Sequence, residues 1–260
     1  MIFAKKRLGQ NFLIDKNIIN NIINTLSLTK DDIVLEIGPG HGELTKRIVK
    51  NVKKLIACEI DKKLVLELEK ELSSFGNIEI INLDFLKLDI PRVFPNLSQK
   101  IKVVGNLPYY ISSPIIAHLL ENKKYIDYIF LTLQKEFIRR IIYNDNSSLK
   151  GAFSFFVQYH SNPKLIFDIS RTCFRPIPKV DSSFIMLAIK ESVLKKDDEE
   201  IFFKIIRRSF QQRRKTLRNS LKEFFPKEIL LTDKEFNFNL RPQALGQKDF
   251  IKLTQIYKKY

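Results

Sequence analysis

Residues 105–110, which read Gly-Asn-Leu-Pro-Tyr-Tyr, follow an apolar run and combine an amide, a fixed turn and aromatic rings. The amide oxygen of Asn106 and a main-chain carbonyl near Leu107 and Pro108 could accept the two N–H hydrogens of an exocyclic amine. The amine of adenine is a poor nucleophile, because its lone pair is delocalised into the ring. Holding both hydrogens would aim that lone pair at an electrophile. This stretch is therefore our candidate catalytic site for modification of a nucleobase.

The residues that follow Asn106 suit the same task. Pro108 fixes the backbone of the turn. Tyr109 offers a ring on which a base removed from its helix or loop could stack, for a gain of about 1–3 kcal/mol. Attack on a donor that is already cationic needs no general base of matched pKa, so no catalytic histidine is required. The structural alternative is an Asn-x-Pro turn after a strand, followed by two tyrosines of the core.

A glycine-rich turn indicates the binding of a nucleoside. Residues 33–42 read IVLEIGPGHG, with glycines at 38, 40 and 42 after an apolar run. Glycine allows unusual backbone angles, and its missing Cβ lets a ligand approach the main chain, so Gly38 is a candidate cofactor contact. A glycine turn alone is a weak signal, since dinucleotide-binding enzymes use a similar G-x-G-x-x-G arrangement.

Two acidic residues follow the next two apolar runs and complete the pattern of a nucleoside site. Glu59 lies about twenty residues beyond the glycines, where a carboxylate can accept both ribose hydroxyls. Asp84 follows the third run and could accept the exocyclic amine of adenine beside an apolar wall. Together these strand ends predict one bound nucleoside, although an NAD-dependent enzyme also fits this half of the chain. Taken singly, Asp84 or the nearby Asp61 could equally be a helix N-cap.

These residues depend on the elements that position them. Short apolar runs alternate with segments whose apolar residues recur every three to four positions, which predicts an α/β fold with a mostly parallel sheet wrapped by helices. Three consecutive strand ends would then meet at one nucleoside. The predicted strands cover residues 33–37, 55–60, 78–83, 101–105, 128–133, 164–169 and 183–189, and the predicted helices cover 43–50, 62–74, 112–120 and 136–143.

The pattern changes near residue 190, and we expect two domains, 1–190 and 191–260. The second opens with the acidic stretch Lys195–Glu200 and contains helical segments without strand-like runs. It has the denser positive charge, with 17 basic and 10 acidic side chains. Its segment 205–221 predicts an amphipathic helix with a basic face for phosphates. A solvated face, or one paired with the acidic stretch, is the alternative.

Composition narrows the range of partners. The 260 residues include 45 Lys and Arg against 29 Asp and Glu, a net charge of +16, which favours a polyanion such as nucleic acid. An AT-rich genome that inflates the lysine content is the alternative. The two cysteines are far apart and the three histidines have no ligand spacing, so we expect neither a disulfide framework nor a metal site. No apolar run suits a signal peptide or a membrane span, and we expect a cytoplasmic protein.

The glycine turn, Glu59 and Asp84 resemble motifs of the class I S-adenosylmethionine-dependent methyltransferases. Asn-Leu-Pro-Tyr at 106–109 resembles the motif of rRNA adenine N6-methyltransferases rather than the Asp-Pro-Pro-Tyr form common in DNA adenine enzymes. The resemblance implies a Rossmann-like sheet with a small C-terminal helical domain, and S-adenosyl-L-methionine as the cofactor. It assigns Gly38, Glu59, Asp84 and Asn106 to that cofactor.

Further motifs extend the resemblance over nearly the whole chain. Residues 8–13, LGQNFL, are similar to an N-terminal element of the family in which the positions of Asn11 and Leu13 contact the cofactor. Residues 174–182, FRPIPKVDS, resemble a loop whose leading aromatic residue, here Phe174, approaches the target base opposite the tyrosine.

The C-terminal part is most similar to the bacterial small-subunit rRNA adenine dimethyltransferase family. Residues 209–221, SFQQRRKTLRNSL, and Leu240–Pro242 resemble that family more than the 23S rRNA resistance methyltransferases. The implied substrate is 16S rRNA in a small ribosomal subunit precursor, with two adjacent adenosines near its 3′ end dimethylated. The alternatives are a 23S rRNA or DNA adenine methyltransferase, and a non-catalytic ribosome-assembly or transcription factor on the same fold.

Overall fold

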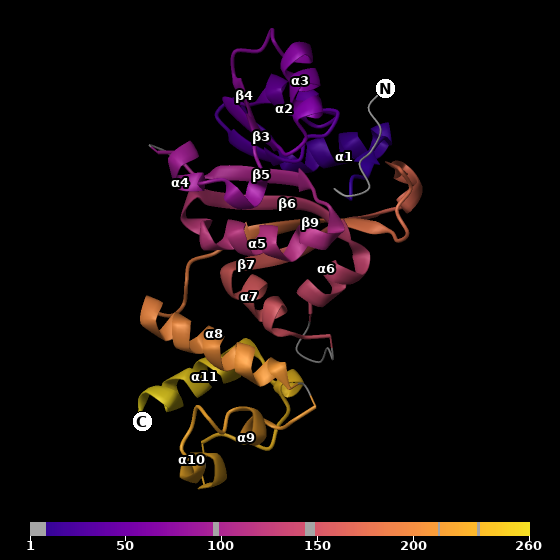
Figure 1. Ribbon diagram of the computed structural model, residues 1–260. Coiled ribbons are helices and arrows are strands. Elements are labelled where there is room, and N and C mark those ends of the chain that lie inside the picture. Colours follow the sequence, from indigo (N-terminus) through magenta and orange to yellow (C-terminus); the bar gives the residue numbers. More distant parts are fainter. Residues whose placement is uncertain (1–8, 96–98, 144–148, 213, 233–234) are drawn as a thin grey trace. The chain divides into compact units, whose positions relative to one another are not determined.

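The computed structural model describes residues 9–95, 99–143, 149–212, 214–232 and 235–260. The chain divides into two compact units (Figure 1). The first unit contains Met1–Ile138 and Asn162–Ile189, and the second contains Arg139–Ser161 and Lys190–Tyr260.

This division differs from the predicted boundary at residue 190 in one segment. The described residues 139–143 and 149–160 belong to the same unit as the C-terminal helices, although they precede the last two strands of the sheet. The reason is apolar packing, because Phe155 and Tyr159 are buried in the core of the second unit. The chain therefore passes between the units near residues 138, 161 and 190, of which the sequence indicated only the last.

The first unit is built on a seven-stranded sheet in the order β4-β3-β2-β5-β6-β9-β7. The neighbours from β4 to β6 pair in parallel, and β6 pairs with β9 antiparallel. The predicted α/β fold is confirmed. Each predicted strand is present, because long apolar runs suit strands that are covered on both faces. The strands are β2 Ile33–Ile37, β3 Lys54–Glu59, β4 Ile78–Asn82, β5 Ile101–Asn106, β6 Ile126–Gln134, β7 Ser161–Ile169 and β9 Ser182–Ile189.

Helices connect these strands, and short polar side chains start several of them. Asp15 caps α1 by accepting the N–H groups of Asn17 and Ile18, and Asp61 caps α3 by accepting the N–H of Lys63 at 3.1 Å. The N-cap alternative is thus realised for Asp61. The helices are α1 Lys16–Leu26, α2 Thr45–Ile48, α3 Lys62–Glu71, α4 Ile90–Val93, α5 Ser112–Glu121 and α6 Lys135–Ile141, with single 3-10 turns η2 Val49–Asn51, η3 Phe85–Lys87, η4 Tyr109–Ile111, η5 Lys123–Tyr125 and η6 Arg171–Cys173.

A small second sheet joins two distant parts of the first unit. Strand β1, Phe12–Leu13, pairs antiparallel with β8, Phe174–Arg175. Leu13 and Phe174 face each other in this register and belong to the apolar core. Strands of two residues are too short to show a periodicity, so the sequence did not predict them. The pairing holds the N-terminal segment against the loop that leads to β9.

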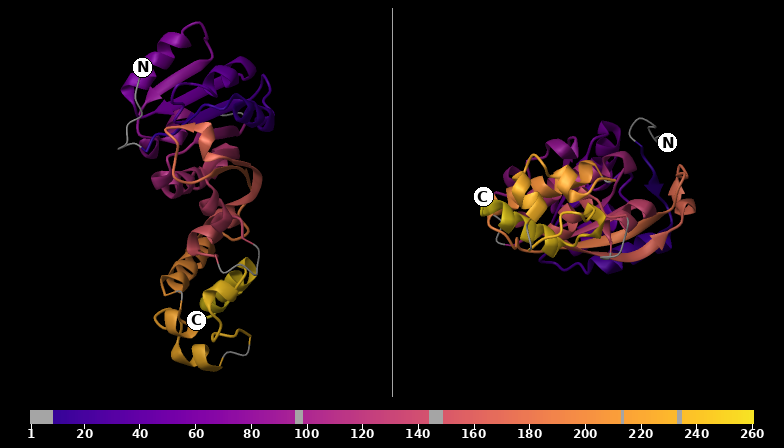
Figure 2. Two further views of the ribbon diagram at one scale, coloured as in Figure 1. Left: turned by 90° about the vertical axis from the view of Figure 1, so that its right-hand side faces the viewer. Right: turned by 90° about the horizontal axis from the view of Figure 1, so that it is seen from below.

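The second unit is helical. Helices α8 and α11 lie side by side in both Figure 1 and Figure 2. The ring of Phe155 on α7 packs 5.6 Å from that of Phe210 on α8 and 5.0 Å from that of Phe250 on α11. In the described ranges, no helix is long and apolar enough to cross a membrane. The helices are α7 Ala152–His160, α8 Lys196–Gln211, α9 Leu217–Ser220, α10 Lys227–Thr232 and α11 Gln247–Lys258, with the 3-10 turn η7 Pro242–Ala244.

The prediction of one amphipathic helix over 205–221 is wrong. Helix α8 ends before residue 212, and α9 begins at Leu217. The N–H groups of Leu217 and Arg218 donate to carbonyls of segment 238–240, at 2.9 and 2.8 Å, so tertiary hydrogen bonds replace the helical ones there. The apolar residues of the segment are buried as expected. Arg213 lies outside the described residues.

Candidate active site

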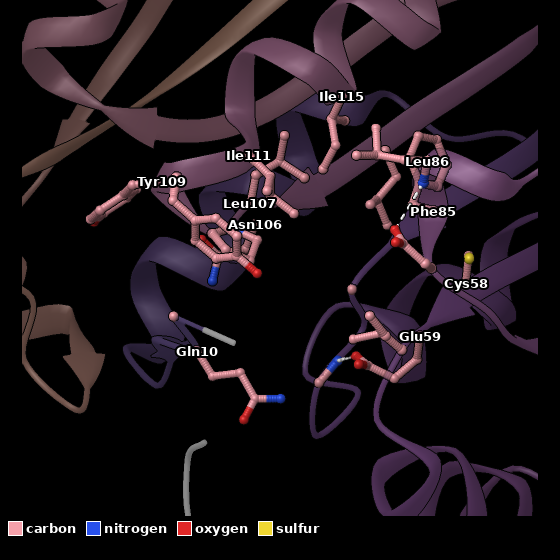
Figure 3. A pocket seen from close by; sticks show the side chains of 18 of the residues that line it. Gln10, Cys58, Glu59, Phe85, Leu86, Asn106, Leu107, Tyr109, Ile111 and Ile115 are labelled. Carbon is pink, nitrogen blue, oxygen red and sulfur yellow. Dashed lines mark hydrogen bonds between the residues drawn. The ribbon is translucent and has the colours of Figure 1, made fainter. Parts of the chain in front are cut away.

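A cavity opens at the carboxyl ends of β2, β3, β4 and β5 in the first unit. Figure 3 shows Asn106, Leu107 and Tyr109 on one side of it, and Glu59 and Phe85 on the other. We call it the strand-end cavity. Of the predicted site residues, Asn11, Gly38, Glu59, Asp84, Asn106, Leu107, Pro108 and Tyr109 line it.

Leu13 and Phe174 do not line the strand-end cavity. They are 6% and 1% exposed and lie in the apolar core, where the β1–β8 pairing directs both side chains. A ring that is 1% exposed has no free face for a base, so this structure does not support Phe174 as the second stacking residue. Asn11 and Phe12, which precede Leu13, face the cavity in its place.

The glycine turn forms one wall of the cavity. Gly38 and Gly40 have φ of 65° and 60°, in the left-handed region that favours glycine. A Cβ on Gly40 would lie 2.9 Å from the ring of Phe12, which covers the turn. A Cβ on Gly38 would meet nothing within 4 Å. The backbone at Gly38 therefore faces open space that a ligand could fill.

Glu59 stands at the end of β3 with both carboxylate oxygens engaged. Oε2 accepts the N–H of Gly40 at 3.2 Å and Oε1 accepts the N–H of Asp61 at 2.9 Å. Burial raises the pKa of Glu59, these two N–H groups oppose the rise, and the charge of Asp61 adds to it. The carboxylate thus ties the glycine turn to the start of α3, and each of its oxygens can accept a further hydrogen bond in the cavity that it lines.

Asp84 and Phe85 form the end of the cavity beyond β4. Asp84 accepts the N–H of Leu86 at 3.1 Å and so caps η3 while lining the cavity. The ring of Phe85 meets His118 edge to face at 5.6 Å, and Nε2 of His118 is 2.9 Å from the carbonyl oxygen of Leu88. Helix α5 therefore holds the apolar wall in place through one histidine.

Cys58 contributes a thiol to the same wall but no nucleophile. Its Sγ donates to the carbonyl of Leu83 at 3.3 Å. Burial, aided by the charges of Glu59 and Asp84, raises the pKa of Cys58 to about 12. At neutral pH the group stays a thiol, and a covalent cysteine mechanism is not favoured. Among the described residues there is also no group of His, Cys, Asp and Glu that could hold a metal ion.

Asn106, at the end of β5, has its amide oriented by the N-terminal segment. Nδ2 donates to the main-chain carbonyl of Asn11 at 2.9 Å. Because the NH2 group is committed to that carbonyl, Oδ1 is presented as an acceptor. The main-chain acceptor beside it is better assigned to Leu107 than to Pro108, since the Pro108 carbonyl already accepts the N–H of Ile111 at 3.3 Å.

Glu36 is a buried carboxyl that the predicted site did not include. It is 2% exposed, one residue before the end of β2, and neither its Oε2 nor Oγ1 of Thr45 has a hydrogen-bond partner of normal geometry in the described structure. Burial raises its pKa from 4.5 to about 8, with a further rise from Glu59 and a partial lowering by the Thr45 hydroxyl. At neutral pH the group is therefore mostly protonated.

This carboxyl should make the stability of the first unit depend on pH. The unfolded chain loses the proton near 4.5 and the folded chain near 8, so stability falls as pH rises between these values. We expect Glu36→Gln, a neutral isostere, to stabilise the protein by on the order of 3 kcal/mol at pH 7 and by less than about 1 kcal/mol at pH 5. Denaturant unfolding at pH 5, 7 and 8 measures this. A difference between variant and wild type that does not grow with pH would contradict it, and Glu69→Gln on the exposed face of α3 is the control.

Comparison with known proteins decides the family. Residues 2–259 match the family described as ribosomal RNA adenine dimethylase. The chain belongs to this family. Ribosomal RNA small subunit methyltransferase A of Lachnoclostridium phytofermentans is 42% identical, over 98% of this chain and 91% of that protein. The protein of the same name from Lactococcus lactis is 39% identical, over 96% and 88%.

Solved structures agree with the family and the fold. A dimethyladenosine transferase from Plasmodium falciparum has a TM-score of 0.78 at 27% identity and covers 95% of this chain and 98% of its own. The 23S rRNA methyltransferase ErmE has a TM-score of 0.73 at 26% identity, over 95% and 100%. The predicted resemblance to rRNA adenine methyltransferases with a Rossmann-like sheet is thus confirmed.

Several cavity residues of this family member were not singled out from the sequence. Tyr110 is 63% exposed at the cavity. The sequence did contain a signal for this residue, because Tyr110 is the second of two tyrosines that directly follow Pro108. Gln10 and Phe12 lie within the LGQNFL motif, in which we predicted cofactor contacts only at Asn11 and Leu13. The apolar residues Leu86, Ile111 and Ile115 carry no local signal, because they look like ordinary core residues until the fold places them.

Proposed function

We propose that this chain transfers methyl groups from S-adenosyl-L-methionine to N6 of adenosines in 16S rRNA, dimethylating two adjacent adenosines near its 3′ end. The observation that carries the proposal is the orientation of Asn106. Its Nδ2 donates to the carbonyl of Asn11, which leaves Oδ1 as an acceptor in a cavity that Leu107 and Tyr109 also line. Two acceptors beside a half-buried aromatic ring suit an exocyclic amine and not an acidic or apolar substrate.

The residues of the strand-end cavity fit this cofactor. The missing Cβ of Gly38 leaves open space at the backbone, and a buried carboxylate, Glu59, stands beside it for the ribose hydroxyls. Asp84 and the ring of Phe85 offer an acceptor and an apolar wall for adenine. When bound, the cofactor supplies an electrophilic methyl group on a sulfonium.

The chain's own residues then orient the second partner. In the first transfer, Oδ1 of Asn106 and the Leu107 carbonyl would accept the two N6 hydrogens, which directs the nitrogen lone pair toward the methyl group. In the second transfer, one of these acceptors would hold the hydrogen that remains, and each transfer releases one N6 proton. Tyr109 supplies the ring for stacking, at about 1–3 kcal/mol. Burial raises the pKa of Tyr109, so its hydroxyl remains protonated at neutral pH. The apolar lining excludes water, which would otherwise solvate the amine.

The substrate class follows from the relatives and from charge. The relatives named for the small ribosomal subunit match over almost the whole chain, including the second unit, and the charge of +16 suits rRNA in a small-subunit precursor. The two cysteines are free, as is usual in reducing cytosol, and we place the enzyme in the cytoplasm. Labelled methyl transfer to naked 16S rRNA, 30S particles, 23S rRNA and duplex DNA, measured in parallel, tests the proposal. Transfer to 23S rRNA or DNA alone, or to none of the four, would overturn it.

Exposed cations of the second unit are candidates for phosphate contacts. Arg207, Arg214 and Lys215 are exposed. Arg218 is a weaker candidate than predicted, because its Nε donates to the carbonyl of Leu230 at 3.1 Å within the unit. At least one acid of the stretch 195–200 is paired elsewhere, because Asp198 forms an ion pair with Lys258 at 2.5 Å.

Removing these three cations should flatten the salt dependence of RNA binding. Each phosphate contact releases counterions, so Arg207→Gln, Arg214→Gln and Lys215→Gln together should reduce the slope of log affinity against log salt by about two units. Filter binding or fluorescence anisotropy across a salt series measures the slope. Lys50→Gln, Lys53→Gln and Lys70→Gln remove the same charge from exposed positions of the first unit as a control. An equal change in both triple variants would show a general charge effect and no phosphate-binding face.

A further inference from the structure

The ring of Tyr109 is fastened at its far end. Its hydroxyl lies 2.7 Å from Oγ of Ser182, a normal length for a hydrogen bond between hydroxyls. Ser182 is fully buried at 0% exposure, whereas Tyr109 is half-buried and lines the strand-end cavity. The bond thus runs from the cavity wall into the protein interior.

Ser182 is itself held rigidly. It is the first residue of β9 and pairs with Gln134 of β6 in the antiparallel ladder. The residue before it is fixed too, because the carbonyl of Asp181 accepts the N–H of Lys135 at 3.1 Å. The ladder between β6 and β9 fixes the backbone of Ser182. The side chain of Tyr109, which is bonded to the Ser182 hydroxyl, therefore loses freedom at both of its ring torsions.

Both ends of the Asn-Leu-Pro-Tyr turn are therefore tied to segments far away in the sequence. Asn106 donates to the carbonyl of Asn11, just before β1, and Tyr109 bonds to Ser182, which follows the loop after β8. Strands β1 and β8 pair with each other, so both hydrogen bonds lead to segments that are themselves joined.

We propose that Ser182 is a positioning residue for the methyl transfer, which fixes the ring of Tyr109 in the orientation that receives the target base. This inference rests on the proposed function. Stacking alone would gain affinity with a mobile ring, but an in-line attack needs the base in one orientation. A ring already held in that orientation places the bound base in line for the attack.

The test compares two variants that remove the same hydrogen bond from opposite ends. Ser182→Ala and Tyr109→Phe both keep the aromatic ring, so stacking surface is retained. We expect each to lower kcat by about five- to tenfold, with KM for rRNA and cofactor affinity changed less than twofold. Because they break one bond, the double variant should be no slower than either single variant.

A neighbouring serine provides the matched control. Ser183 is also buried, at 1% exposure, and its Oγ donates to Asp168 at 2.6 Å, away from the strand-end cavity. Ser183→Ala should therefore cost stability without a specific loss of kcat. Additive losses in the double variant, or a loss of kcat in Ser182→Ala no greater than in Ser183→Ala, would overturn the inference.

A second measurement does not depend on the substrate. In protein with carbon-13 labelled tyrosine rings, the signal of Tyr109 is identified by its absence in Tyr109→Phe. Ser182→Ala should shift or broaden that signal and Ser183→Ala should leave it unchanged. An unchanged signal in Ser182→Ala would reject the positioning role. If wild-type protein methylates no rRNA, the proposed function fails, and this measurement still decides whether Ser182 holds the ring.

Discussion

Asn106→Ala should abolish measurable methyl transfer while cofactor affinity changes little. The variant loses the acceptor that holds one N6 hydrogen and the donor that fixes the amide on the carbonyl of Asn11. Loss of a group that acts in the transition state costs about 10²–10³-fold or more in turnover, with little effect on ground-state binding. Single-turnover transfer of labelled methyl to 30S particles and calorimetric titration with S-adenosylmethionine would separate the two quantities.

Two further substitutions locate the effect. Asn106→Asp keeps an oxygen acceptor but sets a carboxylate against the carbonyl of Asn11, so we expect impaired transfer as well. Tyr109→Ala should lose less than Asn106→Ala, because stacking positions the base without holding its hydrogens. Asn51→Ala is the control, since its amide also donates to a main-chain carbonyl, at 2.9 Å, but outside the strand-end cavity. Near-normal turnover in Asn106→Ala would refute the assigned role.

The sheet was predictable because its signal is local. The run Ile33–Ile37 is apolar except for Glu36 and forms β2 with the same bounds, as expected for a strand covered on both faces. The site residues at strand ends followed from the same pattern, since parallel strands bring their carboxyl ends to one edge. Glu59, Asp84 and Asn106 therefore meet in one cavity, as predicted.

What escaped prediction depends on contacts between distant residues. The hydrogen bond from Asn106 to Asn11 spans 95 positions, and no local pattern encodes it. Phe174 was assigned to the target base by resemblance, but its pairing with Leu13 across β1 and β8 turns the ring into the core. Glu36 lies one residue before the end of β2, close to the predicted site, and only the packed fold shows its carboxyl to be buried and mostly protonated.

Glu59→Ala should raise the dissociation constant for S-adenosylmethionine by at least about a hundredfold. A carboxylate that accepts two ribose hydroxyls makes hydrogen bonds worth about 1.5–3 kcal/mol each, and 1.4 kcal/mol corresponds to a factor of ten. The variant also leaves the N–H of Gly40 without its acceptor, which loosens the glycine turn. Calorimetric titration measures the affinity, and Glu69→Ala on the exposed face of α3 is the control. Unchanged affinity, or tight binding of NAD in wild-type protein, would overturn the assignment of the cavity.

The pH dependence of binding gives an independent check on the same carboxylate. Burial raises the pKa of Glu59, so its charged fraction falls as the pH is lowered toward that raised value. A protonated carboxyl has lost one acceptor and its charge, so cofactor affinity should decrease with decreasing pH. Glu59→Gln should bind weakly at every pH and show a flatter profile. Glu36 also titrates, with a pKa of about 8, so Glu36→Gln is the comparison variant. It should still lose cofactor affinity as the pH is lowered, because Glu59 is unchanged in it. If that fall disappears in Glu36→Gln and persists in Glu59→Gln, the proton belongs to Glu36, and the ribose contact has been assigned to the wrong carboxyl.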